Sequence, residues 1–87
     1  MAITFKRSTG PKPHIQILLD GKVCGKLLPP SYTNRLDEWV IAFYVRWAHS
    51  YALRYPPKYY ATEAYARAAV PAELERVQLE HKLHFLE

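Results

Sequence analysis

The single cysteine is the first candidate for chemistry, because a thiolate beside a base can act as a nucleophile. Cys24 lies in a stretch typical of a strand, and His14 could approach it across a hairpin. The simpler interpretation is that Cys24 is a small core residue of that strand. One cysteine excludes an intramolecular disulfide and a zinc site built from several cysteines.

Two further groups have spacings that could serve metal binding or acid–base chemistry. His81 and His84 would share one face of a helix but point to opposite sides of a strand. The carboxylate pairs are explained more simply as acids in the first turns of helices; they are Asp37 with Glu38, and Glu73 with Glu75. No phosphate-binding glycine loop, nucleophile elbow or His-Glu zinc motif occurs. We therefore expect no catalytic residue, no metal and no cofactor.

The stretch from Tyr51 to Tyr65 is the most unusual part of the chain, because it interleaves tyrosines with cations. Tyr and Arg are favoured at protein interfaces, since they combine a large contact area with few rotatable bonds and hydrogen-bonding ends. The same mixture could stack on exposed bases while its cations hold phosphate. Alternatively, the tyrosines form an aromatic mini-core. The residues that we predict to bind a partner are Lys22, Lys26, Arg46, Arg54, Tyr55, Lys58, Tyr59 and Tyr60.

Charge is divided unevenly along the chain. Residues 1–58 carry nine Lys or Arg and three acids, a net charge of +6, whereas residues 59–87 carry three Lys or Arg and five acids, a net charge of −2. The whole chain has a net charge of +4. This division suggests two electrostatically different surfaces, although solvated faces also vary in charge by chance. A second basic surface is formed by the hairpin and its flanks, although edge-strand lysines also prevent sheet aggregation; its residues are Lys6, Arg7, Lys12, Lys22 and Lys26.

The size of the chain allows one domain, residues 1–87. Hydrophobic residues make up 49% and charged residues 23%, a balance that favours a folded core over disorder. The longest apolar run, Trp39 to Val45, is seven residues and too short to span a membrane. The first seven residues lack the apolar core of a signal peptide. We expect a cytoplasmic protein that does not engage membranes.

The N-terminal part of the chain has the alternation of apolar and polar residues that is typical of strands. A turn is predicted at Gly10–Pro13, and Asp20-Gly21 predicts a hairpin. A three-residue loop, with Gly21 in the left-handed conformation and a bulge, would keep one face apolar better than a two-residue loop. Gly25 indicates that a bulky neighbour packs closely, such as an aromatic residue of a helix. The predicted strands are Ile3–Arg7, His14–Leu19 and Lys22–Leu28.

Helices are predicted for most of the remaining chain. From Asn34 to about Arg54, apolar residues recur at helical spacing, with Trp39, Phe43, Tyr44 and Trp47 expected in the core. Lys58–Val70 is rich in alanine and predicts a shorter helix that Pro71 interrupts. For the tail we favour a helical turn at 71–75 and a strand at 76–86 that joins the sheet; a continuous helix from Pro71 is the alternative. The expected fold is α+β, with a small antiparallel sheet packed on one long and one shorter helix.

The hairpin from Ile15 to Lys26, followed by the helix predicted from Asn34, resembles small phage-encoded accessory proteins that include anti-CRISPR-type inhibitors. Such proteins often pair a short antiparallel sheet with one or two helices. The resemblance covers most of the chain and carries over no binding residue. It implies inhibition of a nucleic-acid-guided nuclease complex by occupation of surfaces that otherwise hold DNA or RNA.

The expected function is that of a non-enzymatic interaction protein that binds and inhibits a protein or ribonucleoprotein complex, such as a CRISPR effector. The alternative is a basic nucleic-acid-binding domain that uses its Lys, Arg and Tyr residues. A third possibility is a subunit whose wide apolar helix face packs on a copy of itself. The chain is accordingly expected to be a monomer or a homodimer.

Overall fold

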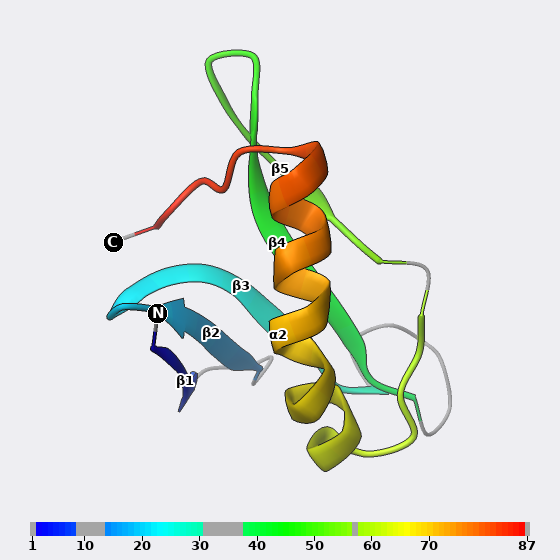
Figure 1. Cartoon of the computed structure of the whole chain (residues 1–87). Helices are drawn as coiled ribbons and strands as arrows, with labels where there is room; N and C mark the ends of the chain where they lie inside the picture. The colour runs from blue at the N-terminus through cyan, green and yellow to red at the C-terminus, as the bar shows by residue number, and fades with distance from the viewer. Residues whose placement is uncertain (1, 9–13, 31–37, 57, 87) are drawn as a thin grey trace.

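The computed structural model describes residues 2–8, 14–30, 38–56 and 58–86, which form an α+β fold (Figure 1). A five-stranded antiparallel sheet has the strand order β1-β2-β3-β4-β5, and the helix α2 packs on one of its faces. The three predicted N-terminal strands are confirmed. The predicted turn at Gly10–Pro13 lies outside the described residues. The elements are β1 (Ile3–Arg7), β2 (Ile15–Leu19), β3 (Lys22–Leu28), β4 (Val40–Trp47), β5 (Ser50–Arg54) and α2 (Glu63–Glu80).

The β2–β3 hairpin turns through two residues and not through the predicted three. Leu19 pairs with Lys22, so the loop consists of Asp20 and Gly21. Both loop residues have positive φ angles, 52° and 83°, as a type I′ turn requires. The left-handed conformation predicted for Gly21 is thus confirmed, and Asp20 shares it. Asp20 also accepts a hydrogen bond from the Ala2 backbone through Oδ1 at 2.8 Å, which fastens the chain before β1 to this turn.

The predicted bulge lies within β3 and not in the turn. The pairing shifts by one residue at Cys24, so that Ile17 lies opposite Gly25, as the preferred register required. The expected close aromatic neighbour of Gly25 is Phe43, whose Cδ1 would lie 2.9 Å from a Cβ at this position. Phe43 belongs to the neighbouring strand β4, so the prediction of an aromatic is confirmed and its assignment to a helix is wrong.

The long helix predicted from Asn34 to about Arg54 is wrong in the described part of that range. Residues 40–54 form the β4–β5 hairpin instead, closed by a pairing of Trp47 with Ser50, whereas residues 34–37 lie outside the description. Every residue from Val40 to Val45 is buried. A strand buried on both faces presents a continuous apolar run, which helical spacing also fits. Its branched and aromatic side chains favour the strand.

Helix α2 differs from the predicted shorter helix at both ends. It begins at Glu63 and not at Lys58, with Thr62 as its N-cap, and it continues through Pro71 to Glu80. The predicted interruption at Pro71 is therefore wrong, and so is the first part, 76–80, of the strand predicted for 76–86. The alternative, a helix that continues from Pro71, holds as far as Glu80. A proline inside a helix removes a backbone hydrogen bond. The apolar face on both sides of this proline compensates by packing on the sheet, through Ala66, Val70, Leu74 and Val77.

The C-terminal segment fills a gap in the sheet. Strands β3 and β4 pair from Leu28 opposite Val40 to Gly25 opposite Phe43, and beyond that point they diverge (Figure 1). Residues 82–86 run between them and make isolated bridges, Leu83 to Val45 and Leu86 to Val23. The C-terminal strand that we predicted is thus reduced to two bridges.

The core lies between α2 and the face of the sheet formed by Ile15, Ile17, Leu27, Ile41 and Phe43. Phe43 and Tyr44 are buried, as predicted, and Trp39 packs partly against the core. Trp47 was also expected in the core, but it is 67% exposed near the tip of the β4–β5 hairpin. Within the described ranges, no helix combines the length and the apolar character that crossing a membrane requires.

Candidate functional site

The structure separates the eight residues predicted to bind a partner. The connector, which we define as the described residues 55–62 between β5 and α2, holds Tyr55, Lys58, Tyr59 and Tyr60, with Arg54 directly before it. Lys26 and Arg46 lie on the face of the sheet that α2 does not cover, because their partners Ala42 and Tyr51 point away from the core. Lys22 is exposed next to the β2–β3 turn. The eight residues therefore do not form one surface.

The tyrosines of the connector have different environments. Tyr55 and Tyr59 are 45% and 48% exposed. Tyr60 packs against the core, and its backbone N–H and C=O both bond to Trp39, at 2.9 and 2.6 Å. Burial, and secondarily the charge of Glu73, raises the pKa of Tyr60. Tyr60 thus acts as an anchor of the connector, whereas Tyr55 and Tyr59 each expose nearly half of their surface to solvent.

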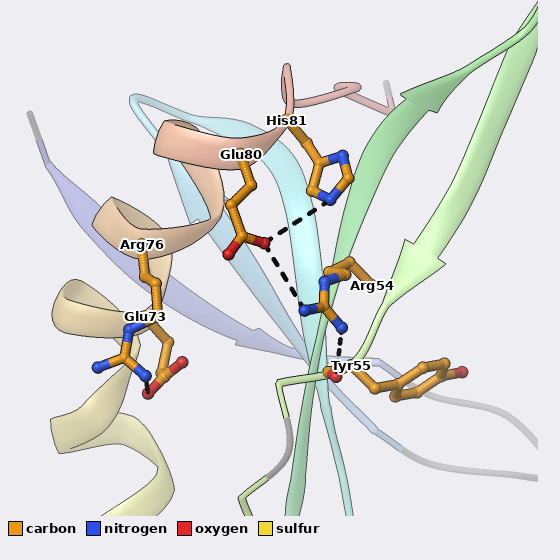
Figure 2. Close-up of polar contacts among 6 residues, drawn as sticks. All are labelled: Arg54, Tyr55, Glu73, Arg76, Glu80 and His81. Atoms are coloured by element: carbon orange, nitrogen blue, oxygen red, sulfur yellow. Dashed lines mark hydrogen bonds and ion pairs between the residues drawn. The ribbon is translucent and has the colours of Figure 1, made fainter.

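Ion pairs fasten the connector and β5 to helix α2. Lys58 Nζ lies 3.5 Å from Oε1 of Glu73, a carboxylate that is almost fully buried. Arg54 donates to the carbonyl oxygen of Tyr55 at 3.1 Å and lies 3.7 Å from Oε2 of Glu80 (Figure 2). Arg76 adds a second cation 3.7 Å from Glu73 (Figure 2). Two of the cations predicted for partner binding, Arg54 and Lys58, therefore form ion pairs within the protein.

A second group of side chains, which we call the basic aromatic cluster, lies on the helix-free face. The rings of Tyr44 and Tyr51 meet edge to face, with centroids 5.3 Å apart. Tyr51 also stacks on His84, with a centroid distance of 4.9 Å and an interplanar angle of 17°. Lys26 places its Nζ 5.9 Å from the centroid of Tyr44. The full cluster is Lys26, Tyr44, Arg46, Tyr51, Lys82 and His84.

Only Lys26 and Arg46 of this cluster were predicted to bind a partner; its two tyrosines and its C-terminal members, Lys82 and His84, were not. Arg46 donates its backbone N–H to the carbonyl of Lys82 at 2.8 Å, and His84 donates to the carbonyl of Tyr44 at 2.9 Å. These contacts exist only because the C-terminal segment lies beside β4. The period-2 alternation of residues 82–86 is the one sequence signal that indicated such a placement.

A groove adjoins the cluster at the end of α2. Its volume is about 470 Å³, and it lies between the last turn of α2, strand β4 and the C-terminal segment. None of the described residues that line it is acidic. Glu80, at the last turn of α2, is directed instead toward Arg54 and His81 (Figure 2). The lining residues are Arg46, Gln78, His81, Lys82, Leu83 and Phe85.

The uneven charge along the chain corresponds to its secondary structure. The five strands carry six Lys or Arg and no acidic residue, whereas α2 carries four Glu and two Arg. Arg7 pairs with Glu63 of α2 at 2.8 Å, and Arg54 pairs with Glu80. In the part of the chain that the structure describes, neither Arg46 nor Lys82 forms an ion pair. The sheet is thus the basic side of the molecule and the helix the acidic side.

The candidates for nucleophilic and metal chemistry are not assembled by the fold. Cys24 is fully buried, and burial raises the pKa of its thiol to about 11, so the reactive thiolate is disfavoured at neutral pH. His14 does not oppose it, because the next residue, Ile15, pairs with Leu27. Among the described residues, no three His, Cys, Asp or Glu side chains come together to hold a metal ion.

Comparison of the chain with protein families, with curated proteins and with solved structures found no match. Function is therefore inferred from the connector and the basic aromatic cluster.

Proposed function

We propose that this protein is a non-enzymatic binding protein that docks on a partner protein through its connector. The observation that carries the proposal is the exposure of Tyr55 and Tyr59, which lie on either side of a 2.8 Å bond from Lys58 N–H to the Pro56 carbonyl. Tyrosines that bury a large area on binding are enriched among the residues that dominate interface energy. The connector carries two such tyrosines within five residues of sequence.

The connector is also fixed before binding. Tyr60 joins it to Trp39 by two backbone hydrogen bonds, and Lys58 joins it to the buried carboxylate of Glu73. A segment that is already ordered loses less conformational entropy when it binds. The surrounding cations, Arg54 and Lys58, favour a partner surface that carries carboxylates or phosphates near its apolar contact.

The resemblance to anti-CRISPR-type inhibitors suggests which partner this is. The β2–β3 hairpin that contributes to the resemblance is present, while β4 and β5 occupy the described part of the helix predicted from Asn34. Under this proposal the protein is phage-encoded, acts in the cytoplasm and inhibits a nucleic-acid-guided nuclease complex by covering one of its surfaces. Cleavage of a target by the purified complex, with and without the protein, tests this extension separately from binding.

The experiment for the binding function compares two variants. Tyr55→Ala with Tyr59→Ala removes the proposed contact, and Tyr65→Ala removes a tyrosine that is 65% exposed on α2. A partner recovered with the wild type and identified by mass spectrometry is purified, and its affinity for each variant is measured. We expect the double variant to weaken binding by about a hundredfold, or about 1.4 kcal/mol for each tyrosine.

The controls separate contact from folding. The Tyr65→Ala variant should bind within about twofold of the wild type, and thermal melting should show that both variants remain folded. If the wild type and the double variant bind the partner equally well, the connector is not the contact surface. A double variant that does not fold would show that these tyrosines belong to the core, which also contradicts the proposal.

A further inference from the structure

Two cations face each other across the junction of β4 and the C-terminal segment. Val45 and Leu83 form a bridge, and the adjacent Arg46 N–H donates to the Lys82 carbonyl at 2.8 Å. Arg46 and Lys82 are therefore directly opposed and project from the same face. Like charges in this position repel and destabilise a sheet. Neither cation has an ion-pair partner among the described residues, so an anion placed between them would relieve the repulsion.

The groove supplies further groups that suit an anion. Arg46 and Lys82 both line it, together with the amide of Gln78 and the imidazole of His81. Phe85, which is 39% exposed, contributes a flat apolar surface in the same groove. The carbonyl end of α2 lies nearby and itself favours cations, which accounts for part of the basic character. It does not account for an aromatic lining.

The combination of aromatic rings and paired cations favours a ligand that carries both a flat ring and an anionic group. Next to Arg46, the stacked rings of Tyr51 and His84 form a platform on which a base can stack, and Tyr51 is 43% exposed. Single-stranded nucleic acid offers both a flat base and a phosphate within each nucleotide. A peptide of acidic residues alone would satisfy the cations but offers no aromatic ring to stack on the platform.

We propose that the basic aromatic cluster and the adjoining groove bind single-stranded nucleic acid, with Arg46 and Lys82 on phosphate and Tyr51 stacked on a base. This site is separate from the connector, and it would operate whether or not the connector binds a protein. Lys26, over the ring of Tyr44, provides a third cation on the path of the backbone.

The direct test is the binding of a fluorescein-labelled oligothymidylate of about 12 nucleotides, followed by anisotropy as a function of salt. Three phosphate contacts predict a slope of about −2 in a plot of log affinity against log salt.

Replacing Arg46 and Lys82 together by Ala should lower the affinity at least about tenfold and bring the slope to about −0.7. Tyr51→Leu should weaken binding about tenfold without changing the slope. The matched control is Arg7→Ala with Arg67→Ala, which removes two cations that pair with Glu63 of α2 and should change neither the affinity nor the slope.

Charge reversal gives a second readout that loss of folding cannot imitate. In Lys82→Glu the new carboxylate faces Arg46, so we expect a melting temperature at or above that of the wild type and loss of oligonucleotide binding. Unchanged binding by this variant would overturn the proposal. So would binding of an oligoglutamate peptide in place of the oligonucleotide, because it would identify an acidic protein as the ligand. The Tyr55→Ala, Tyr59→Ala variant should bind the oligonucleotide normally, so failure of this site and failure of the connector are distinguishable.

Discussion

Gly25 and Phe43 are paired directly across β3 and β4, and the ring of Phe43 occupies the space that a side chain at position 25 would need. A Cβ at this position would lie 2.9 Å from Cδ1 of Phe43 and would also collide with the carbonyl oxygen of Ala42. This is the last pair before the two strands diverge and the C-terminal segment inserts between them. The absence of a side chain at Gly25 thus permits the close packing of Phe43 at the point where the sheet opens.

Gly25→Ala should therefore lower the free energy of unfolding by about 2–3 kcal/mol, as overpacking of a core does. One of the two colliding atoms belongs to the backbone, which cannot rotate away. Gly21→Ala serves as a comparison, because nothing lies within 4 Å of a Cβ there and only the positive φ opposes it, at a cost of about 1 kcal/mol. Urea titration of both variants measures the difference; a smaller loss at position 25 would contradict the packing that we describe.

Ala48 in the β4–β5 turn has a φ of 52°, a left-handed conformation that disfavours a residue with a Cβ. Ala48→Gly should raise the free energy of unfolding by about 0.5–1 kcal/mol, since relief of the strain exceeds the added entropy of the unfolded chain. Ala52→Gly, in the extended strand β5, should have the opposite effect. Thermal melting of the two variants, compared with the wild type, tests this prediction. A lower melting temperature in both variants would argue against strain at the turn.

Pro71 lies inside α2 and is exposed, so its ring contributes little to the core. Pro71→Ala restores a backbone donor to the helix and should raise the free energy of unfolding by about 1–3 kcal/mol. Urea denaturation of the wild type and the variant tests this. If the variant were no more stable, the proline would have to stabilise the native chain through contacts other than those of an ordinary helix position.

Glu73 is almost fully buried, and its Oε2 has no hydrogen-bond partner. Glu73→Met should leave stability unchanged or raise it by up to about 1 kcal/mol, because the cost of burying the charge disappears with the ion pairs. Removing both cations instead, in Lys58→Ala with Arg76→Ala, leaves the carboxylate uncompensated and should cost about 2 kcal/mol. Glu75→Met, at an exposed position of the same helix, is the control in urea denaturation. A large loss in Glu73→Met would show that the carboxylate is required.

The thiol of Cys24 should make stability depend on pH in the alkaline range. Burial raises its pKa from 9.0 to about 11, so the unfolded chain loses this proton at lower pH than the folded protein. The stability that the protonated Cys24 thiol contributes to the folded protein is fully present below pH 9 and is lost as the pH rises toward 11. The free energy of unfolding should fall by about 2 kcal/mol more in the wild type than in Cys24→Ala over this range. Parallel pH profiles of the two proteins would contradict the burial of the thiol.

The sequence by itself determined the elements that are encoded locally. Period-2 alternation defined β1, β2 and β3. The Asp20-Gly21 pair defined the hairpin between β2 and β3, because few other residues adopt two successive positive φ angles. The alanine-rich stretch Lys58–Val70 identified the first half of α2, although the helix begins at Glu63. Net charge counted along the chain identified the basic and acidic sides, since strands and helix occupy separate parts of it.

The tertiary structure decided everything that depends on partners distant in the chain. An apolar run such as residues 40–45 suits a buried helix or a central strand, and only its pairing with β3 and β5 selects the strand. The helix extends through Pro71 because packing on the sheet outweighs a local penalty. The basic aromatic cluster exists because the C-terminal segment enters the gap between β3 and β4 and brings Lys82 opposite Arg46. No local pattern encodes that contact, since its two sides are separated by β5, the connector and the whole of α2.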